Sequence, residues 1–157
     1  MSARTRRRGF IAIGLLALLP GSAVGQGGDA RTLPTPVALN IAAERFVGAV
    51  ASGEKSELRG LLAPSLRFTL NGQTRSGVRA EQAVVAMEFL LDHVTDVELE
   101  IQRVEPMGVD DASGFAEFRW RARDRDTGAH TDYTFLLIFE RADPRWVVVE
   151  LRILPRG

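Results

Sequence analysis

The second half of the chain contains four segments in which apolar residues occupy alternate positions, and no helical pattern separates them. These segments are 97–102, 116–123, 131–140 and 147–153. Because side chains alternate between the two faces of a strand, this period predicts strands with one buried face. Strands that follow one another through short polar turns, with no helix between them, predict an antiparallel sheet. A parallel sheet of strand–helix–strand units is excluded by the same order.

The segment 131–140 is apolar on both of its faces. One face carries the residues Tyr133, Phe135, Leu137 and Phe139. Leu136 and Ile138 lie on the other face, and helices can cover only one side of the sheet. In the last segment, strict alternation places Val147, Val149, Leu151 and Ile153 on one face. It places Trp146 on the other, on the same side of the sheet as Leu136 and Ile138. An apolar patch left in water usually marks an interface, so we expect a homodimer that pairs through a sheet face.

The first half of the chain predicts three helices and a hairpin. The helices are expected at 35–52, 54–62 and 78–94, the last being the longest. Each shows apolar residues at three- and four-residue spacing, which places them on one buried stripe. Between the second and third helices, Leu66, Phe68 and Leu70 alternate with polar residues, and Asn71-Gly72 is a strong turn dipeptide.

This order resembles the nuclear transport factor 2-like superfamily, which includes ketosteroid isomerases and polyketide cyclases. The likeness is carried by AAERFVGAVASGEKSELRGLLAPSLRFTLNGQTRSG and by the terminal WVVVELRIL, and it covers about residues 36–155. It implies an α+β fold, a cone-shaped roll with three N-terminal helices packed on a strongly curved, mainly antiparallel sheet. The corresponding domain would span 35–157. Because this fold carries many unrelated activities, the resemblance alone implies no reaction.

The steroid isomerases of this superfamily use a general-base Asp, a Tyr and a protonated Asp. The resemblance places the base at Leu70, the Tyr at Phe46 and the second Asp near Phe135. A leucine or phenylalanine side chain neither accepts a proton nor donates a hydrogen bond. The resemblance therefore implies that this chain is not a steroid isomerase of that mechanism, and we interpret it as non-catalytic.

The apolar stripes are expected to meet inside the cone and to line a pocket for a small apolar ligand. The expected lining residues are Phe46, Val50, Phe68, Leu70, Met87, Leu90, Phe118, Trp120 and Phe135. Weak catalytic candidates are His130, Asp132 and Tyr133, which lie close together in the sequence. The chain has no cysteine, and its two histidines lack metal-site spacing, so no metal and no cofactor are expected.

The charge balance argues against nucleic acid as a partner. The chain has 20 basic and 20 acidic residues, but four arginines lie within residues 1–25, so the rest is mildly acidic. A nucleic-acid-binding domain needs a basic face. Arg119, Arg121, Arg123 and Arg125 share one face of a strand, where we expect Glu98, Glu100 and Glu150 of neighbouring strands to pair with them.

The first 25 residues have the three parts of a secretory signal peptide. A basic start precedes the apolar segment 10–19, and Ala23-Val24-Gly25 provides small residues before a cleavage site. An apolar segment of ten residues is too short to span a bilayer, so no permanent membrane anchor is expected. Arg7-Arg8 also resembles a twin-arginine motif, which leaves that route and the general route open. Residues 26–34 are expected to form a flexible linker.

Three functions fit these patterns. The first is an exported bacterial protein, periplasmic or secreted, whose non-catalytic domain binds a small apolar ligand or a protein partner. The second is an isomerase-, cyclase- or hydrolase-like enzyme with an atypical pocket. The third is a structural dimerisation module, which a cone filled by its own side chains would favour. An apolar pocket of about 300 Å³ or more with converging polar groups would favour the first two.

We expect the mature protein to begin near Gln26 and to lie outside the cytoplasm, because the apolar segment is followed by a small-residue cleavage site. N-terminal sequencing of the protein from its native host checks this, and a chain that still begins at Met1 would contradict it. Changing Arg7 and Arg8 to Lys should block export only on the twin-arginine route.

Overall fold

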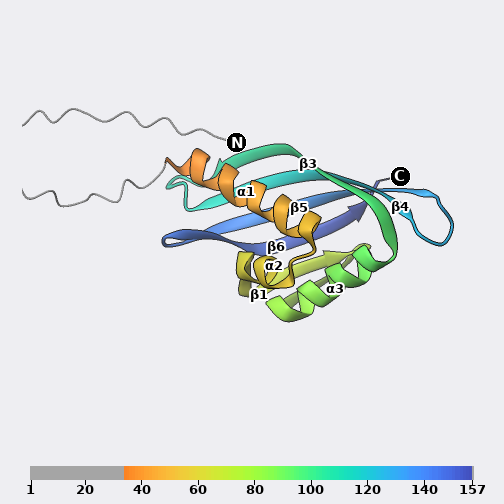
Figure 1. Ribbon diagram of the computed structural model, residues 1–157. Helices are drawn as coiled ribbons and strands as arrows, with labels where there is room; N and C mark the ends of the chain where they lie inside the picture. Colours follow the sequence, from red (N-terminus) through yellow and green to blue (C-terminus); the bar gives the residue numbers. More distant parts are fainter. Residues whose placement is uncertain (1–33, 157) are drawn as a thin grey trace, which may run out of the picture. The chain divides into compact units, whose positions relative to one another are not determined.

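Three helices lie on one side of a six-stranded sheet in the computed structural model, which describes residues 34–156 (Figure 1). The helices are α1 (Thr35–Ser52), α2 (Lys55–Leu61) and α3 (Ala80–Asp92). The strands are β1 (Leu62–Leu70), β2 (Gln73–Arg79), β3 (Val94–Met107), β4 (Ser113–Asp124), β5 (His130–Ala142) and β6 (Arg145–Pro155). Their order is β2-β1-β6-β5-β4-β3. Only the β1–β6 pair is parallel, which confirms the expected α+β fold with a mainly antiparallel sheet.

The sequence explains where the first helix ends, but the third helix is shorter than the sequence predicts. α1 stops at Gly53, whose φ of 65° lies in the left-handed region that glycine adopts without strain. The helix expected over 78–94 is shorter and is not the longest, because α3 has 13 residues and α1 has 18. Its start is delayed because β2 continues to Arg79, where it still pairs with β1.

The inner face of the sheet, which faces the helices, carries two rows of apolar side chains. One row crosses four strands through Phe68, Leu151, Leu137 and Ala116. The next row crosses the same strands through Leu70, Ile153, Phe135 and Phe118. Directly opposite residues share a face, so the register itself brings these side chains into contact. All except Leu70 are buried.

The first helix covers these rows with an apolar stripe. Its buried residues are Leu39, Ala42, Ala43, Phe46, Ala49 and Val50. The ring of Phe46 packs against the ring of Phe118 with 5.5 Å between centroids. On the sheet itself, the ring of Trp120 packs at a tilt against the rings of Tyr133 and Phe135, with 5.0 and 5.6 Å between centroids. Aromatic pairs at this spacing add to the free energy of simple apolar burial.

A bulge in β6 overturns the strict alternation expected for the last strand. Ile138 pairs with Glu150 and Phe139 pairs with Val148, which leaves Val149 as the extra residue. A bulge reverses the facing of every residue on one side of it. Trp146 and Val148 therefore join the core with Leu151, and Trp146 does not lie on the outer face as expected.

The predicted signal peptide (1–25) and linker residues 26–33 lie outside the described residues. Within residues 34–156, no helix is long and apolar enough to cross a membrane.

Gly114 is required by close packing between β4 and α1. A Cβ added there would lie 2.5 Å from Leu39 Cδ1, and Leu39 is fully buried. We expect Gly114→Ala to lower the free energy of unfolding by about 1–3 kcal/mol, because overpacking forces neighbours out of their rotamers. The control is Gly48→Ala within α1, where a Cβ would meet nothing within 4 Å. That change should raise stability by about 0.5–1 kcal/mol, since alanine favours helix interiors. Urea denaturation measures both, and equal effects would contradict the packing argument.

Candidate functional site

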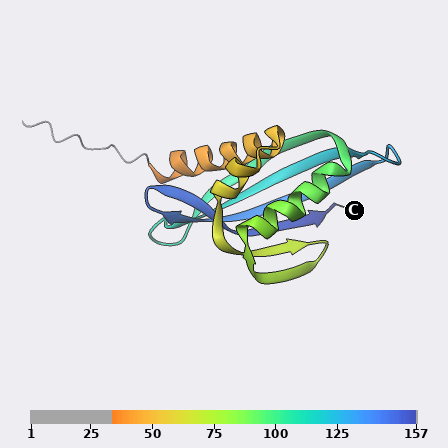
Figure 2. The same cartoon turned by 60° about the horizontal axis from the view of Figure 1, so that its bottom comes forward.

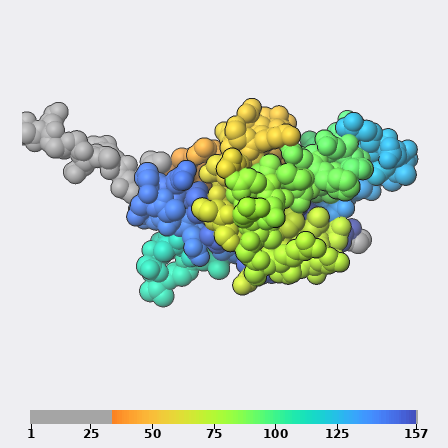
Figure 3. Space-filling view, turned by 90° about the horizontal axis from the view of Figure 1, so that it is seen from below, coloured from red at the N-terminus to blue at the C-terminus, as the bar shows by residue number. Residues whose placement is uncertain are grey.

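A cavity of about 610 Å³ lies between the β1–β2 hairpin and α3. Figures 2 and 3 show the hairpin and α3 side by side on the same part of the molecule. The cavity is lined by residues from three elements and their turn: Phe68, Leu70, Asn71, Gln73, Arg75, Ser76, Gly77, Val78, Gln82 and Ala86. It is large enough for a drug-sized organic molecule.

The hairpin register decides which side chains face this cavity. Leu70 pairs with Gln73 and Phe68 pairs with Arg75, so all four share the inner face. The register then shifts between Phe68 and Leu66, at Ser76 and Gly77 on β2. Gly77 has a φ of 73°, a left-handed value that suits the bulge and favours glycine. The shift returns Val78 to the inner face, opposite Leu66.

The third helix closes the other side with Gln82 and Ala86, which lie one turn apart. Gln82 Oε1 accepts a hydrogen bond from the Arg79 backbone N–H at 3.1 Å, which caps the helix start. A backbone N–H can only donate, so the amide oxygen of Gln82 must be the atom engaged. The Gln82 NH₂ group therefore remains a donor for a molecule in the cavity.

The lining combines an apolar surface with several neutral polar groups and one ion. Phe68, Leu70, Val78 and Ala86 supply the hydrocarbon, and Arg75 is the single ionisable residue of the lining. A guanidinium stays protonated throughout the pH range of folded proteins, so it cannot act as a general base. Ser76 has no histidine or carboxylate beside it in the lining to take its proton. The cavity is thus equipped to hold and orient a ligand.

Of the expected pocket residues, the cavity brings together Phe68 and Leu70. Leu90 is partly buried against the core, and the other expected residues lie within it: Phe46, Val50, Met87, Phe118, Trp120 and Phe135. Apart from Leu90, these side chains are buried. The cavity lies instead where burial ends, beside the half-buried Leu70.

The positions that the steroid-isomerase resemblance selected do converge. Leu70 and Phe135 belong to one row of the inner face, separated by Ile153 on β6. Phe46 packs from α1 onto Phe118, the next residue of that row. Where the isomerase mechanism needs a base and two donors, this row presents hydrocarbon.

The weak catalytic candidates His130, Asp132 and Tyr133 are not assembled into a site. Tyr133 lies on the inner face against Trp120, whereas Asp132 pairs with Arg119 on the outer face. His130 is exposed at the start of β5, with Arg123 Nη2 at 3.4 Å from its Nε2. The three side chains do not point to a common centre.

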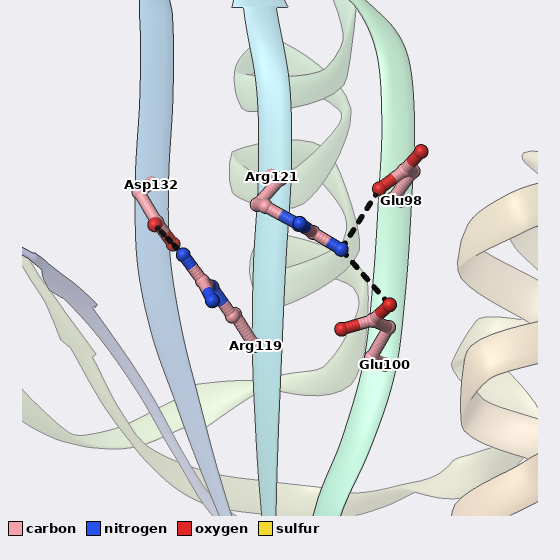
Figure 4. Close-up of polar contacts among 5 residues, drawn as sticks. All are labelled: Glu98, Glu100, Arg119, Arg121 and Asp132. Carbon is pink, nitrogen blue, oxygen red and sulfur yellow. Dashed lines mark hydrogen bonds and ion pairs between the residues drawn. The ribbon is translucent and has the colours of Figure 1, made fainter.

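Asp132 and Arg119 form an ion pair at 2.7 Å on the outer face (Figure 4). The hydrogen bond from Arg119 lowers the pKa of the Asp132 carboxyl and raises the pKa of the guanidinium. A carboxylate with a lowered pKa is a weaker base. Its environment therefore works against the role of Asp132 as a proton acceptor.

Three of the four arginines pair across the sheet, but only Arg121 takes the expected glutamates; Arg123 pairs with Asp96, and Arg125, which lies beyond the end of β4, forms no ion pair within residues 34–156. Arg121 pairs with both Glu98 and Glu100, as expected (Figure 4). Arg119 takes Asp132 instead. Glu150 of β6 pairs instead with Arg67 of β1 and with Arg152 of its own strand, because β5 separates β6 from β4 in the sheet. Among residues 34–156, no cluster of histidine and acidic side chains could hold a metal ion.

Sequence reasoning missed the polar lining residues Asn71, Gln73, Arg75 and Gln82. The sequence contains a pattern that predicts two of them, Gln73 and Arg75. A two-residue turn at Asn71-Gly72 places Gln73 opposite Leu70 and Arg75 opposite Phe68, so both face inward with them. Nothing in the sequence indicates that α3 would bring Gln82 to the same cavity.

The fold and the apolar inner face define a domain of the nuclear transport factor 2-like class. A family model for the SnoaL-like domain matches residues 43–149, which is more than half of the chain. The chain belongs to this SnoaL-like domain family. A comparison with curated proteins found no match.

Solved structures show the same fold at low sequence identity. A ketosteroid isomerase-like protein from Erwinia carotovora atroseptica SCRI1043 has a TM-score of 0.65 at 13% identity, covering 80% of this chain and 98% of that one. A DUF4783 family protein from Bacteroides uniformis ATCC 8492 has a TM-score of 0.60 at 16% identity, covering 73% and 96%. At these identities the likeness carries the fold alone.

Proposed function

We propose that this chain is an exported binding domain, and that its cavity between the β1–β2 hairpin and α3 holds a small, largely apolar ligand. The observation that carries the proposal is the lining itself. An apolar surface and four neutral polar side chains surround a cavity of about 610 Å³ whose single ionisable group is a guanidinium. Such a site binds and orients a molecule without offering it a proton acceptor.

The two alternative functions are supported less well. An isomerase-, cyclase- or hydrolase-like enzyme needs a base or nucleophile at the ligand, and the resemblance-derived positions Phe46, Leu70 and Phe135 provide neither. A purely structural module has no use for polar groups that converge on a cavity. Export is supported by the signal pattern of residues 1–25, which is independent of the cavity.

A test of the proposal fills the cavity from α3. We expect the neutral dye Nile red to bind the domain with increased fluorescence, and Ala86→Trp to weaken this binding about tenfold or more by occupying the cavity. Val85→Trp is the matched control, because Val85 is the neighbouring residue, is 62% exposed and does not line the cavity. Its affinity should stay within about twofold of the parent chain.

Thermal melting followed by circular dichroism confirms that both tryptophan variants are folded, and Ala86→Met replaces Ala86→Trp if the larger side chain unfolds the domain. Absence of dye binding by the parent chain, or equal loss in the Val85 and Ala86 variants, would contradict the proposed cavity.

We propose in addition that two copies of the domain pair through the outer face of the sheet. Phe115 and Ile138 are directly opposite on β4 and β5, and both are partly exposed on this face with Leu136 and Val149 nearby. Glutamates and arginines of the same strands surround them, so the face carries both charges and can complement itself across a two-fold axis. The correction for Trp146 makes this patch smaller than the sequence suggested.

Light scattering at tens of micromolar protein should give the mass of a dimer, and Ile138→Glu should give a monomer, because an unpaired charge would be buried at the centre of the interface. The control is Ile41→Glu, an exposed position on α1, on the opposite side of the sheet. A monomeric parent chain would rule out this pairing.

A further inference from the structure

We propose that the ligand of this cavity is a carboxylate with an apolar body, and that Arg75 is the residue that selects it. The inference rests on the proposed function, since it names the class of molecule that the cavity takes. The hydrocarbon of the ligand would lie against Phe68 and Leu70, and its carboxylate would meet the guanidinium on β2.

The hairpin register places the charge beside the apolar surface. Arg75 is directly opposite Phe68 in the β1–β2 ladder, and Gln73 is directly opposite Leu70. Opposite residues of an antiparallel pair project from the same face with their Cβ atoms about 5 Å apart. The guanidinium, the amide and the two apolar side chains therefore belong to one surface, the floor of the cavity.

Arg75 also differs from the arginines of the outer face in lacking an acidic partner. Arg67, Arg119 and Arg121 each form an ion pair across the sheet. Within residues 34–156, Arg75 forms neither an ion pair nor a side-chain hydrogen bond, and no aspartate or glutamate lines the cavity. The positive charge that faces the cavity is thus balanced by no group of the lining.

Neutral polar groups complete the recognition of an anion. The oxygen of Gln82 is held by the backbone N–H of Arg79, so its NH₂ group is the part free to donate. Asn71, Gln73 and Ser76 provide further side chains that can donate hydrogen bonds. A planar guanidinium binds both oxygens of a carboxylate in a fork, and hydrogen bonds to a charged acceptor are stronger than those to a neutral one.

The volume of the cavity and the four apolar residues of its lining favour a carboxylic acid with an aliphatic or aromatic body over a small inorganic anion. A bare anion would leave Phe68, Leu70, Val78 and Ala86 unused, and these residues form the apolar part of the lining. A neutral apolar molecule would make no use of the guanidinium, which is exposed on the hairpin beside the apolar lining.

The test compares octanoate with octanamide, which has the same chain and shape without the charge. Displacement of Nile red or isothermal titration calorimetry measures both affinities in low-salt buffer. We expect the parent domain to bind octanoate about tenfold more tightly than octanamide, the ratio that one charge-assisted hydrogen-bonded pair supplies. Arg75→Gln should bring the two affinities together by weakening octanoate alone, and Arg75→Lys should keep part of the preference.

Arg45→Gln is the control, because Arg45 is an exposed arginine on α1 that does not line the cavity. It should retain the preference of the parent domain, and thermal melting verifies that each variant is folded. If Arg75→Gln fails to fold, Arg75→Lys and the salt dependence of octanoate binding decide the question.

The outcomes separate the two proposals. Equal affinities for octanoate and octanamide in the parent domain, with binding lost in Ala86→Trp, would overturn the role of Arg75 and leave the apolar binding site standing. A preference for octanoate that survives Arg75→Gln would overturn it as well. Absence of binding of either molecule and of the dye would overturn the proposed function and this inference with it.

Discussion

The structure depends on covering two rows of apolar side chains on one face of a curved sheet. Each row crosses four strands in exact register, and burying a large apolar side chain stabilises the fold by about 1.5–3 kcal/mol. α1 supplies the cover with a stripe of small and aromatic residues, and Phe46 on Phe118 is its central contact. The same packing explains Gly114, because the buried Leu39 side chain of α1 occupies the space that a Cβ there would need.

Burial is complete beneath α1 and incomplete at the hairpin, and this difference places the cavity. Leu70 ends its row half-buried, whereas Phe135 and Phe118 of the same row are sealed in the core. α3 packs against the hairpin, and the small side chain of Ala86 does not fill the space between them.

Arginines on the two faces of the sheet differ in whether an acidic side chain pairs with them. On the outer face, Arg121 and Arg119 are matched by acids from the adjacent strands, so their charges are largely balanced locally (Figure 4). Such exposed pairs contribute little to stability individually. On the inner face, Arg75 stands at the cavity without an acidic neighbour in the lining. A balanced surface suits a contact between copies, and an unbalanced cation suits the recognition of an anion.

The sequence by itself determined the strands, the three helices and the inward direction of Leu70, because these follow from the periods of apolar residues and from the alternation of side chains along a strand. It also predicted that Phe46, Leu70 and Phe135 would share the interior without polar chemistry. Only the tertiary structure decided that Trp146 is buried, since the bulge at Val149 reverses the facing of the strand without any signal in the alternating pattern. The tertiary structure alone also decided where the cavity lies. Arg75 and Gln82 come from separate elements, so whether they meet depends on how α3 packs against the hairpin. No local sequence pattern encodes that packing.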